Sequence, residues 1–123
     1  APPQGAAQTG RSAFALLGWR QGARMEPLII QIGPGHGDPS FRSLDGEMLL
    51  HVLFGRVRLL SEKGEQVELG PGDSAYIPGF PGHRIVNSSS VEPARILLVT
   101  TPPTTRRDDL LDRGRGFVLQ SEV

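Results

Sequence analysis

The side chains that could do chemistry in this chain are few. Its three histidines are His36, His51 and His83, and it contains no cysteine. Without thiols the chain can form no disulfide, thiolate metal site or thiol nucleophile, a composition that suits a reducing, cytoplasmic location. It also has no Gly-rich phosphate loop, no nucleophile elbow and no cluster of carboxylates. The candidate functional groups are therefore the imidazoles and whatever the fold brings near them.

His83 has the most distinctive surroundings of the three. It lies in GPGDSAYIPGFPGHRIVN, residues 70–87, where a Gly-Pro-Gly-Asp turn precedes a short apolar strand and a Pro-Gly loop precedes the histidine. An earlier stretch, GEMLLHVLFGRVRLL at residues 46–60, predicts a strand, a bend at Gly55 and a second strand. A hairpin tip at residues 63–65 follows that second strand.

Alternation along a strand decides whether His51 and His83 can share a site. One face carries Met48, Leu50 and Val52, and the opposite face carries Leu49, His51 and Leu53. If the first face is inward, His51 is a surface or subunit-interface histidine, apart from His83. If the second is inward, no bulge near Gly55 is needed to keep the next strand in phase, and this alternative stays open. His36 falls in a polar loop, residues 36–45, which we expect to be exposed.

The remaining apolar runs and the turn residues predict an all-β fold. Runs at residues 12–20, 25–32 and 94–100 indicate strands, and residues 117–119 add a last strand or pack across a sheet edge. Sixteen glycines and eleven prolines imply short strands with tight turns, which favours a sandwich or barrel. The expected core or pocket residues are Met48, Leu50, Val52, Ile77, Ile85, Leu97 and Val99.

Length and charge restrict the functional classes. A chain of 123 residues accommodates one domain, for which we expect residues 1–10 to be a flexible linker or frayed end and residues 11–123 to fold. Residues 106–113 mix both charge signs and indicate a solvated segment or one helical turn. Thirteen basic and thirteen acidic residues leave no net charge, so the chain lacks the electrostatic footprint of a nucleic-acid or anionic-membrane binder. No apolar run approaches the ~20 residues of a membrane span.

The two stretches around Gly55 and His83 together resemble the cupin family. The second cupin motif is G-x5-P-x-G-x2-H-x3-N, and here Gly72, Pro78, His83 and Asn87 stand at its spacings while Phe80 replaces its second glycine. The resemblance implies a cupin-type jelly-roll β-barrel with His83 inside the barrel mouth, at a metal-ligand position of the family.

The first cupin motif, by contrast, lacks its ligands. Aligning its glycine on Gly55 puts Met48 at the family's glutamate, and Arg42 with Leu44, or Phe41 with Ser43, at its two histidines. One imidazole does not hold a divalent ion, which needs three or four protein ligands. His83 is thus the only retained ligand position, and we expect no stoichiometric divalent metal and no other cofactor.

Within the cupins, the order of the runs at residues 25–32, 45–59, 67–87 and 94–102 resembles the C-terminal sensor domain of bacterial regulators with an XRE-type helix-turn-helix. That resemblance implies a small-molecule effector as ligand, a homodimer, and DNA contact only through a helix-turn-helix domain that this chain lacks. The alternatives are a stand-alone metal-free ligand-binding cupin and a small isomerase- or epimerase-like enzyme that uses His83 with Tyr76. No aspartate is placed to orient that imidazole, so catalysis is the weaker hypothesis.

We therefore expect a ligand pocket beside His83 with Arg42, Met48 and Tyr76 as its walls. Arg42 would favour a carboxylate-bearing ligand through paired charge-assisted hydrogen bonds, or else is a solvated loop residue. His83 itself has two main readings: a polar anchor for an organic ligand, or a structural histidine hydrogen-bonded to backbone or to a carboxylate such as Glu47.

Overall fold

The computed structural model describes residues 10–15, 22–103 and 118–119. The expected linker, the charged segment 106–113 and the end of the first apolar run fall largely or wholly outside these ranges. The described residues contain nine strands and no helix. They are β1 (Arg11–Ala15), β2 (Glu26–Ile32), β3 (Glu47–Phe54), β4 (Val57–Ser61), β5 (Gln66–Leu69), β6 (Ser74–Pro78), β7 (His83–Asn87), β8 (Ala94–Thr101) and β9 (Val118–Leu119).

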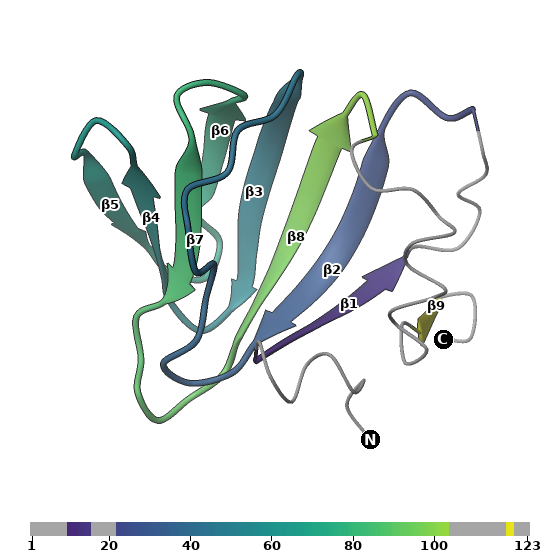
Figure 1. The fold of residues 1–123 in the computed structure, drawn as a ribbon. Helices are drawn as coiled ribbons and strands as arrows, with labels where there is room; N and C mark the ends of the chain where they lie inside the picture. The colour runs from purple at the N-terminus through teal and green to yellow at the C-terminus, as the bar shows by residue number, and fades with distance from the viewer. Residues whose placement is uncertain (1–9, 16–21, 104–117, 120–123) are drawn as a thin grey trace.

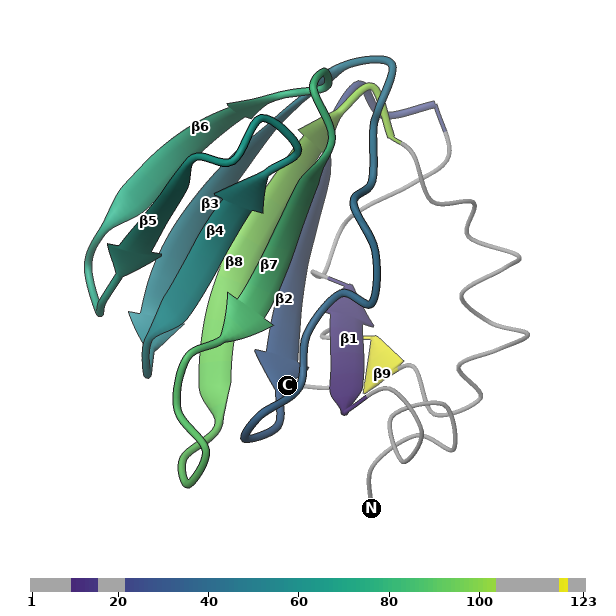
Figure 2. The same ribbon diagram turned by 60° about the vertical axis from the view of Figure 1, so that its left-hand side comes forward.

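The strands form two sheets that face each other. The larger has the order β6-β3-β8-β2-β1-β9 and the smaller the order β5-β4-β7 (Figure 1). All pairings are antiparallel except that of β1 with β9. Figure 2 shows the small sheet lying across β3, β8 and β2. The expected all-β jelly-roll is confirmed, and residues 118–119 do add a strand at one sheet edge.

Gly55 makes the corner between the two sheets. Its φ is +81°, a conformation that a residue with a Cβ rarely adopts, and it separates β3 in the large sheet from β4 in the small one. Just before it, the register between β3 and β8 shifts between Val52 and Phe54, which marks a β-bulge. The extra residue at the bulge lets Met48, Leu50 and Val52 of β3 face inward together with Val57 and Leu59 of β4. His51 therefore faces outward.

The hydrophobic core fills the space between the two sheets. Its buried members come from both: Leu28, Ile30, Ile32, Leu50, Val52, Val57, Leu59, Leu69, Ile77, Ile85, Ala94, Ile96 and Leu98. Met48 packs against this cluster while remaining partly exposed. The expectation for β8 was wrong, because Ala94, Ile96 and Leu98 face inward and Leu97 and Val99 lie on the outer face. Every residue from 96 to 99 is apolar, so hydrophobicity alone could not show which alternate set is inward.

The segment between β2 and β3 runs beside β7 as an irregular extension of the small sheet. Isolated bridges join Gly37 to Val86 and Arg42 to His83. Within this segment Asp38 is only 6% exposed. The expectation that residues 36–45 form an exposed loop was therefore wrong at Asp38, whose backbone N–H donates to the Ile85 carbonyl at 3.0 Å.

Asn87, the last residue of the second motif, ties the loops together at the end of the barrel away from His83. Its side-chain amide donates to the carbonyl oxygens of Ile32 and Gly33, both at 3.1 Å, and of Glu92 at 2.8 Å. Its Oδ1 accepts from the Ser89 backbone N–H at 2.8 Å. A side chain at this position thus serves the fold. Among the described residues no helix is long and apolar enough to cross a membrane.

Candidate functional site

A pocket opens between the two sheets at the end of the barrel where β7 begins. It encloses about 90 Å³. Apolar side chains from five strands form its floor, namely Leu28, Ile30, Met48, Ile77, Ile85 and Leu98. Four polar residues also line it, namely Asp38, Arg42, His83 and Thr100. An apolar cavity with a few convergent polar groups is the usual form of a small-molecule site.

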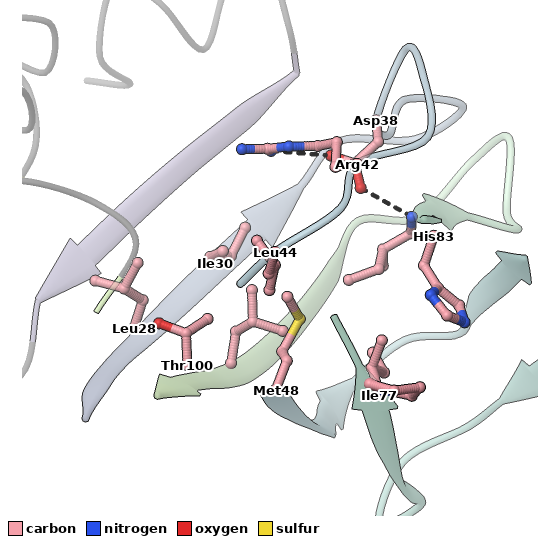
Figure 3. Close-up of a pocket in the computed structure, with 12 residues that line it drawn as sticks. Leu28, Ile30, Asp38, Arg42, Leu44, Met48, Ile77, His83 and Thr100 are labelled. Atoms are coloured by element: carbon pink, nitrogen blue, oxygen red, sulfur yellow. Dashed lines mark hydrogen bonds and ion pairs between the residues drawn. The ribbon is translucent and has the colours of Figure 1, made fainter. Parts of the chain in front are cut away.

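Backbone pairing places Arg42 and His83 on the same face. The Arg42 N–H donates to the His83 carbonyl and the His83 N–H to the Arg42 carbonyl, both at 3.0 Å. Side chains directly opposite each other in an antiparallel pair project to the same side, and here both line the pocket. In Figure 3 the imidazole points toward Ile77, while the Arg42 guanidinium lies beside Asp38 and extends away from the imidazole.

The His83 ring is half-buried, and no hydrogen bond joins it to any other described residue. The proposed partner Glu47 is the first residue of β3 and lies outside the pocket. The imidazole is thus held by strand geometry, with both ring nitrogens available to a ligand.

Asp38 is the site residue that sequence reasoning missed. Its Oδ2 accepts from the Ile85 backbone N–H at 2.9 Å, and its Oδ1 lies 3.6 Å from an Arg42 terminal nitrogen (Figure 3). The aspartate side chain is 7% exposed and the arginine side chain 60%. Ion pairs at exposed groups are worth little, so this one orients Arg42 loosely. The only signal was an Asp-Pro in a Gly-rich stretch, which by itself indicates no more than a turn.

Thr100 lines the pocket on the side away from His83 (Figure 3). Its Oγ1 is buried without a hydrogen-bond partner among the described residues. An unsatisfied buried hydroxyl costs roughly 1–3 kcal/mol. Sequence reasoning missed this group as well, because a threonine at the end of an apolar strand is ordinary β composition.

The donor set at this site does not fit a divalent metal. Arg42, Leu44 and Met48, which stand at the ligand positions of the first cupin motif, line the same pocket as His83. None of these three side chains replaces an imidazole or carboxylate ligand. The pocket then offers a metal ion only the His83 imidazole and the Asp38 carboxylate, and that carboxylate already accepts a backbone N–H. Within the described ranges no three histidine, aspartate or glutamate side chains are grouped as metal ligands would be.

Tyr76 lies outside the pocket, contrary to the expectation that it forms a wall. It is 64% exposed on the outer face of β6, and its neighbours Ile77 and Pro78 line the pocket instead. The hydrogen bond that the Tyr76 hydroxyl donates to the Glu47 carboxylate, together with the negative charge of that carboxylate, raises the pKa of the Tyr76 phenol. Tyr76 therefore cannot act with His83 in one catalytic pair.

The other two histidines are also separate from the pocket. His51 projects from the outer face of β3, where its Nδ1 lies 2.6 Å from the Ser74 hydroxyl oxygen. His36 is exposed beside β7 and borders a different hollow. Of the four residues expected at the site, the structure brings together His83, Arg42 and Met48.

Comparison with known proteins places the chain in a family. The model of the cupin domain matches residues 28–100. This range contains both motifs, all of β3 to β7 and most of β2 and β8. A search of curated proteins gave no significant match.

Solved structures with the same fold include proteins with quite different descriptions. A sugar phosphate isomerase of the cupin superfamily from Silicibacter pomeroyi is 30% identical, with a TM-score of 0.65 over 84% of this chain and 66% of that one. The cupin domain of an XRE family transcriptional regulator from Enterobacter cloacae is 22% identical, with a TM-score of 0.65 over 76% of this chain and 98% of that one. The polyketide cyclase RemF from Streptomyces resistomycificus is 24% identical, with a TM-score of 0.65 over 76% and 66%.

This chain spans just under two thirds of the isomerase's length. The two structures below 25% identity share the fold with it. The family match covers more than half of the chain and coincides with the two-sheet barrel and the inward His83. The chain belongs to the cupin superfamily.

Proposed function

We propose that this cupin domain binds a small, acid-bearing organic molecule beside His83 without a metal ion, as the effector-sensing part of a bacterial transcriptional regulator. The observation that carries the proposal is the replacement of the family's metal-ligand set by Arg42, Leu44 and Met48 around a pocket that stays open and apolar. Such a lining favours binding of an organic group over coordination chemistry.

The pocket's size and lining define the ligand class. Its volume of about 90 Å³ is below the roughly 300–1,000 Å³ of sites that enclose drug-sized ligands, so it takes a compact group or one end of a larger molecule. The floor accepts an apolar part. A carboxylate at the rim would pair with Arg42, whose exposed guanidinium is held only loosely by Asp38.

Two observations support the sensing role: the fold shared with a regulator's cupin domain and the absence of a net charge. The Enterobacter regulator's cupin domain is matched over nearly its whole length. The chain has no net charge, so DNA would be contacted by a separate helix-turn-helix domain. The homodimer expected for such a sensor would cover the apolar side chains on the outer face of β3, where Leu49, Leu53 and Phe54 are 45%, 44% and 54% exposed.

A second candidate is isomerisation of a sugar phosphate, favoured by the 30% identity over 84% of the chain to the Silicibacter isomerase. Proton transfer in such a reaction needs a base within reach of the substrate carbon and a group to orient that base. Here His83 is the one imidazole in the pocket, and Asp38 is committed to a backbone N–H and to Arg42. The pocket therefore favours binding.

Two experiments separate these functions. The coding sequence upstream of Ala1 is read for a helix-turn-helix, and the full regulator, if one is encoded, is tested for ligand-dependent release of its own promoter DNA. In parallel, aldose and ketose phosphates are incubated with the purified domain and followed by ¹³C NMR. Ligand-dependent DNA release without isomerisation is the expected result. Isomerisation that is lost in His83→Ala would overturn the sensing proposal.

A further inference from the structure

A second hollow lies on the outside of the barrel, on the face of β7 opposite the pocket. Its volume is about 360 Å³. Residues 35–39, which run beside β7 in Figure 1, form one wall, and Arg84 and Val86 of β7 form the other. Because His83 and Ile85 face inward, alternation along β7 directs the Arg84 side chain outward into this separate space.

Arg84 is held in a defined orientation. Its Nε donates to the Asp38 carbonyl oxygen at 3.0 Å, and its guanidinium carbon lies 5.6 Å from the centre of the Phe41 ring. These two contacts occupy the Nε–H and one face of the guanidinium plane and leave the two terminal NH2 groups, which carry four donors, uncommitted. Within the described part of the chain no carboxylate lies in ion-pair distance of Arg84.

The charges around the hollow also favour an anion. Asp38 contributes its backbone there, while its carboxylate accepts from the Ile85 N–H and pairs with Arg42 on the pocket side. His36 contributes its backbone there, and its side chain, like that of Asp38, projects to the other side of the segment because Gly37 between them pairs with the outward-facing Val86. The Arg84 guanidinium is therefore the charged group that faces this space, and the Asp38 carboxylate is directed away from it.

The wall that carries His36 is fixed before any ligand arrives. The His36 carbonyl accepts from the Asn87 N–H at 2.8 Å, and the next residue, Gly37, packs directly on Val86. A Cβ at Gly37 would lie 2.5 Å from the Val86 Cα, so only glycine permits this approach. Preorganisation of this kind lowers the ordering cost of binding.

We propose that this hollow is a binding site for the oxyanion group of a small molecule, a phosphate or a carboxylate. The Arg84 terminal nitrogens bind two of its oxygens. The fork geometry of a guanidinium suits both kinds of oxyanion. The site is independent of the pocket beside His83, and it stands or falls separately from the proposed function.

The test is a titration of ¹⁵N-labelled protein with inorganic phosphate and, separately, with acetate, at constant ionic strength and followed by amide NMR shifts. Saturable shifts confined to residues 35–39 and 84–86 are expected for at least one of the two ions. The stronger of the two identifies the preferred group. Linear shifts, or shifts spread over all basic residues, would overturn the site.

Variants assign the effect to its side chains. Arg84→Gln should weaken binding at least tenfold, His36→Gln should leave it unchanged because that side chain points away from the hollow, and Arg95→Gln serves as the matched control. Arg95 is an exposed outer-face arginine of β8 that also uses one nitrogen on a neighbouring group, Gln31, at 2.7 Å. Arg84→Lys keeps the charge but loses the Nε bond, so it should retain weak binding even if Arg84→Gln fails to fold. Equal binding by the parent and by Arg84→Lys would contradict the proposal.

Discussion

Replacing Asn87 by alanine should lower the stability of the barrel by an amount that its contacts define. The side chain makes four hydrogen bonds, three from its amide to the carbonyls of Ile32, Gly33 and Glu92 and one to its Oδ1 from the Ser89 N–H. A buried hydrogen bond contributes about 1 kcal/mol net. Since two of the amide bonds share one hydrogen, we expect a loss of about 3 kcal/mol in the free energy of unfolding. That corresponds to about 12 °C in melting temperature for a chain of this length.

Urea denaturation followed by far-ultraviolet circular dichroism measures this loss, and Ser90→Ala, an exposed position in the same loop, is the control. Asn87→Asp sharpens the test. It keeps the size and one acceptor but has no amide donor, and its charge faces carbonyl oxygens, so it should be at least as unstable as Asn87→Ala. A loss below about 0.5 kcal/mol for Asn87→Ala, or near-parental stability for Asn87→Asp, would refute the view that this network stabilises the closed end of the barrel.

Three further predictions follow from individual residues. Gly55→Ala has φ +81° and a new Cβ 2.6 Å from a facing carbonyl oxygen, so it should lower the free energy of unfolding by more than about 2 kcal/mol. Gly64→Ala has φ +93° but open space around it, so it should lower the free energy of unfolding by only about 1 kcal/mol. Equal losses in calorimetry would show that the close approach at Gly55 does not matter. The phenol pKa of Tyr76, the single tyrosine of the chain, should lie above its ordinary value in an ultraviolet titration and fall back in Glu47→Gln, and an unchanged midpoint would remove Glu47 as the cause. Arg42→Gln should weaken a carboxylate ligand of the pocket about tenfold in calorimetric titration while leaving its uncharged amide analogue unaffected, and equal affinities for parent and variant would remove Arg42 from the site.

Much of the barrel could be predicted because its signals are local. Turn glycines and prolines divide the chain into short apolar runs, and Gly55 with φ +81° lies where the sequence predicts a bend. The inward face of β3 was predicted correctly because the motif spacing fixes the phase from Gly55 back to Met48. The hairpin tip at residues 63–65 also forms, with the Ser61 N–H donating to the Glu65 carbonyl at 2.8 Å.

Errors arose where both faces of a strand are apolar or where a long-range contact decides burial. On β8 the run from Ile96 to Val99 offers two equivalent alternations, and the pairing with β2 and β3 selects the one that buries Ile96 and Leu98. On β6 the alternation that buries Ile77 places its neighbour Tyr76 on the outer face, so the two residues could not both face the pocket. Asp38 is buried because its segment is bridged to β7, where its own hydrogen-bond partners Arg84 and Ile85 lie 46 and 47 residues later in the chain, and no local pattern encodes such a contact.

The central claim is that the pocket beside His83 binds an organic ligand without a divalent ion. A thermal-shift screen of small carboxylic acids and their neutral analogues, run in EDTA on the parent domain and on His83→Ala, tests it most directly. A ligand that binds only the folded state raises the melting temperature through RT ln(1 + [L]/Kd). The account predicts hits that persist in EDTA and shrink or vanish in His83→Ala. Hits that need an added divalent metal, or that shift His83→Ala as much as the parent, would contradict it.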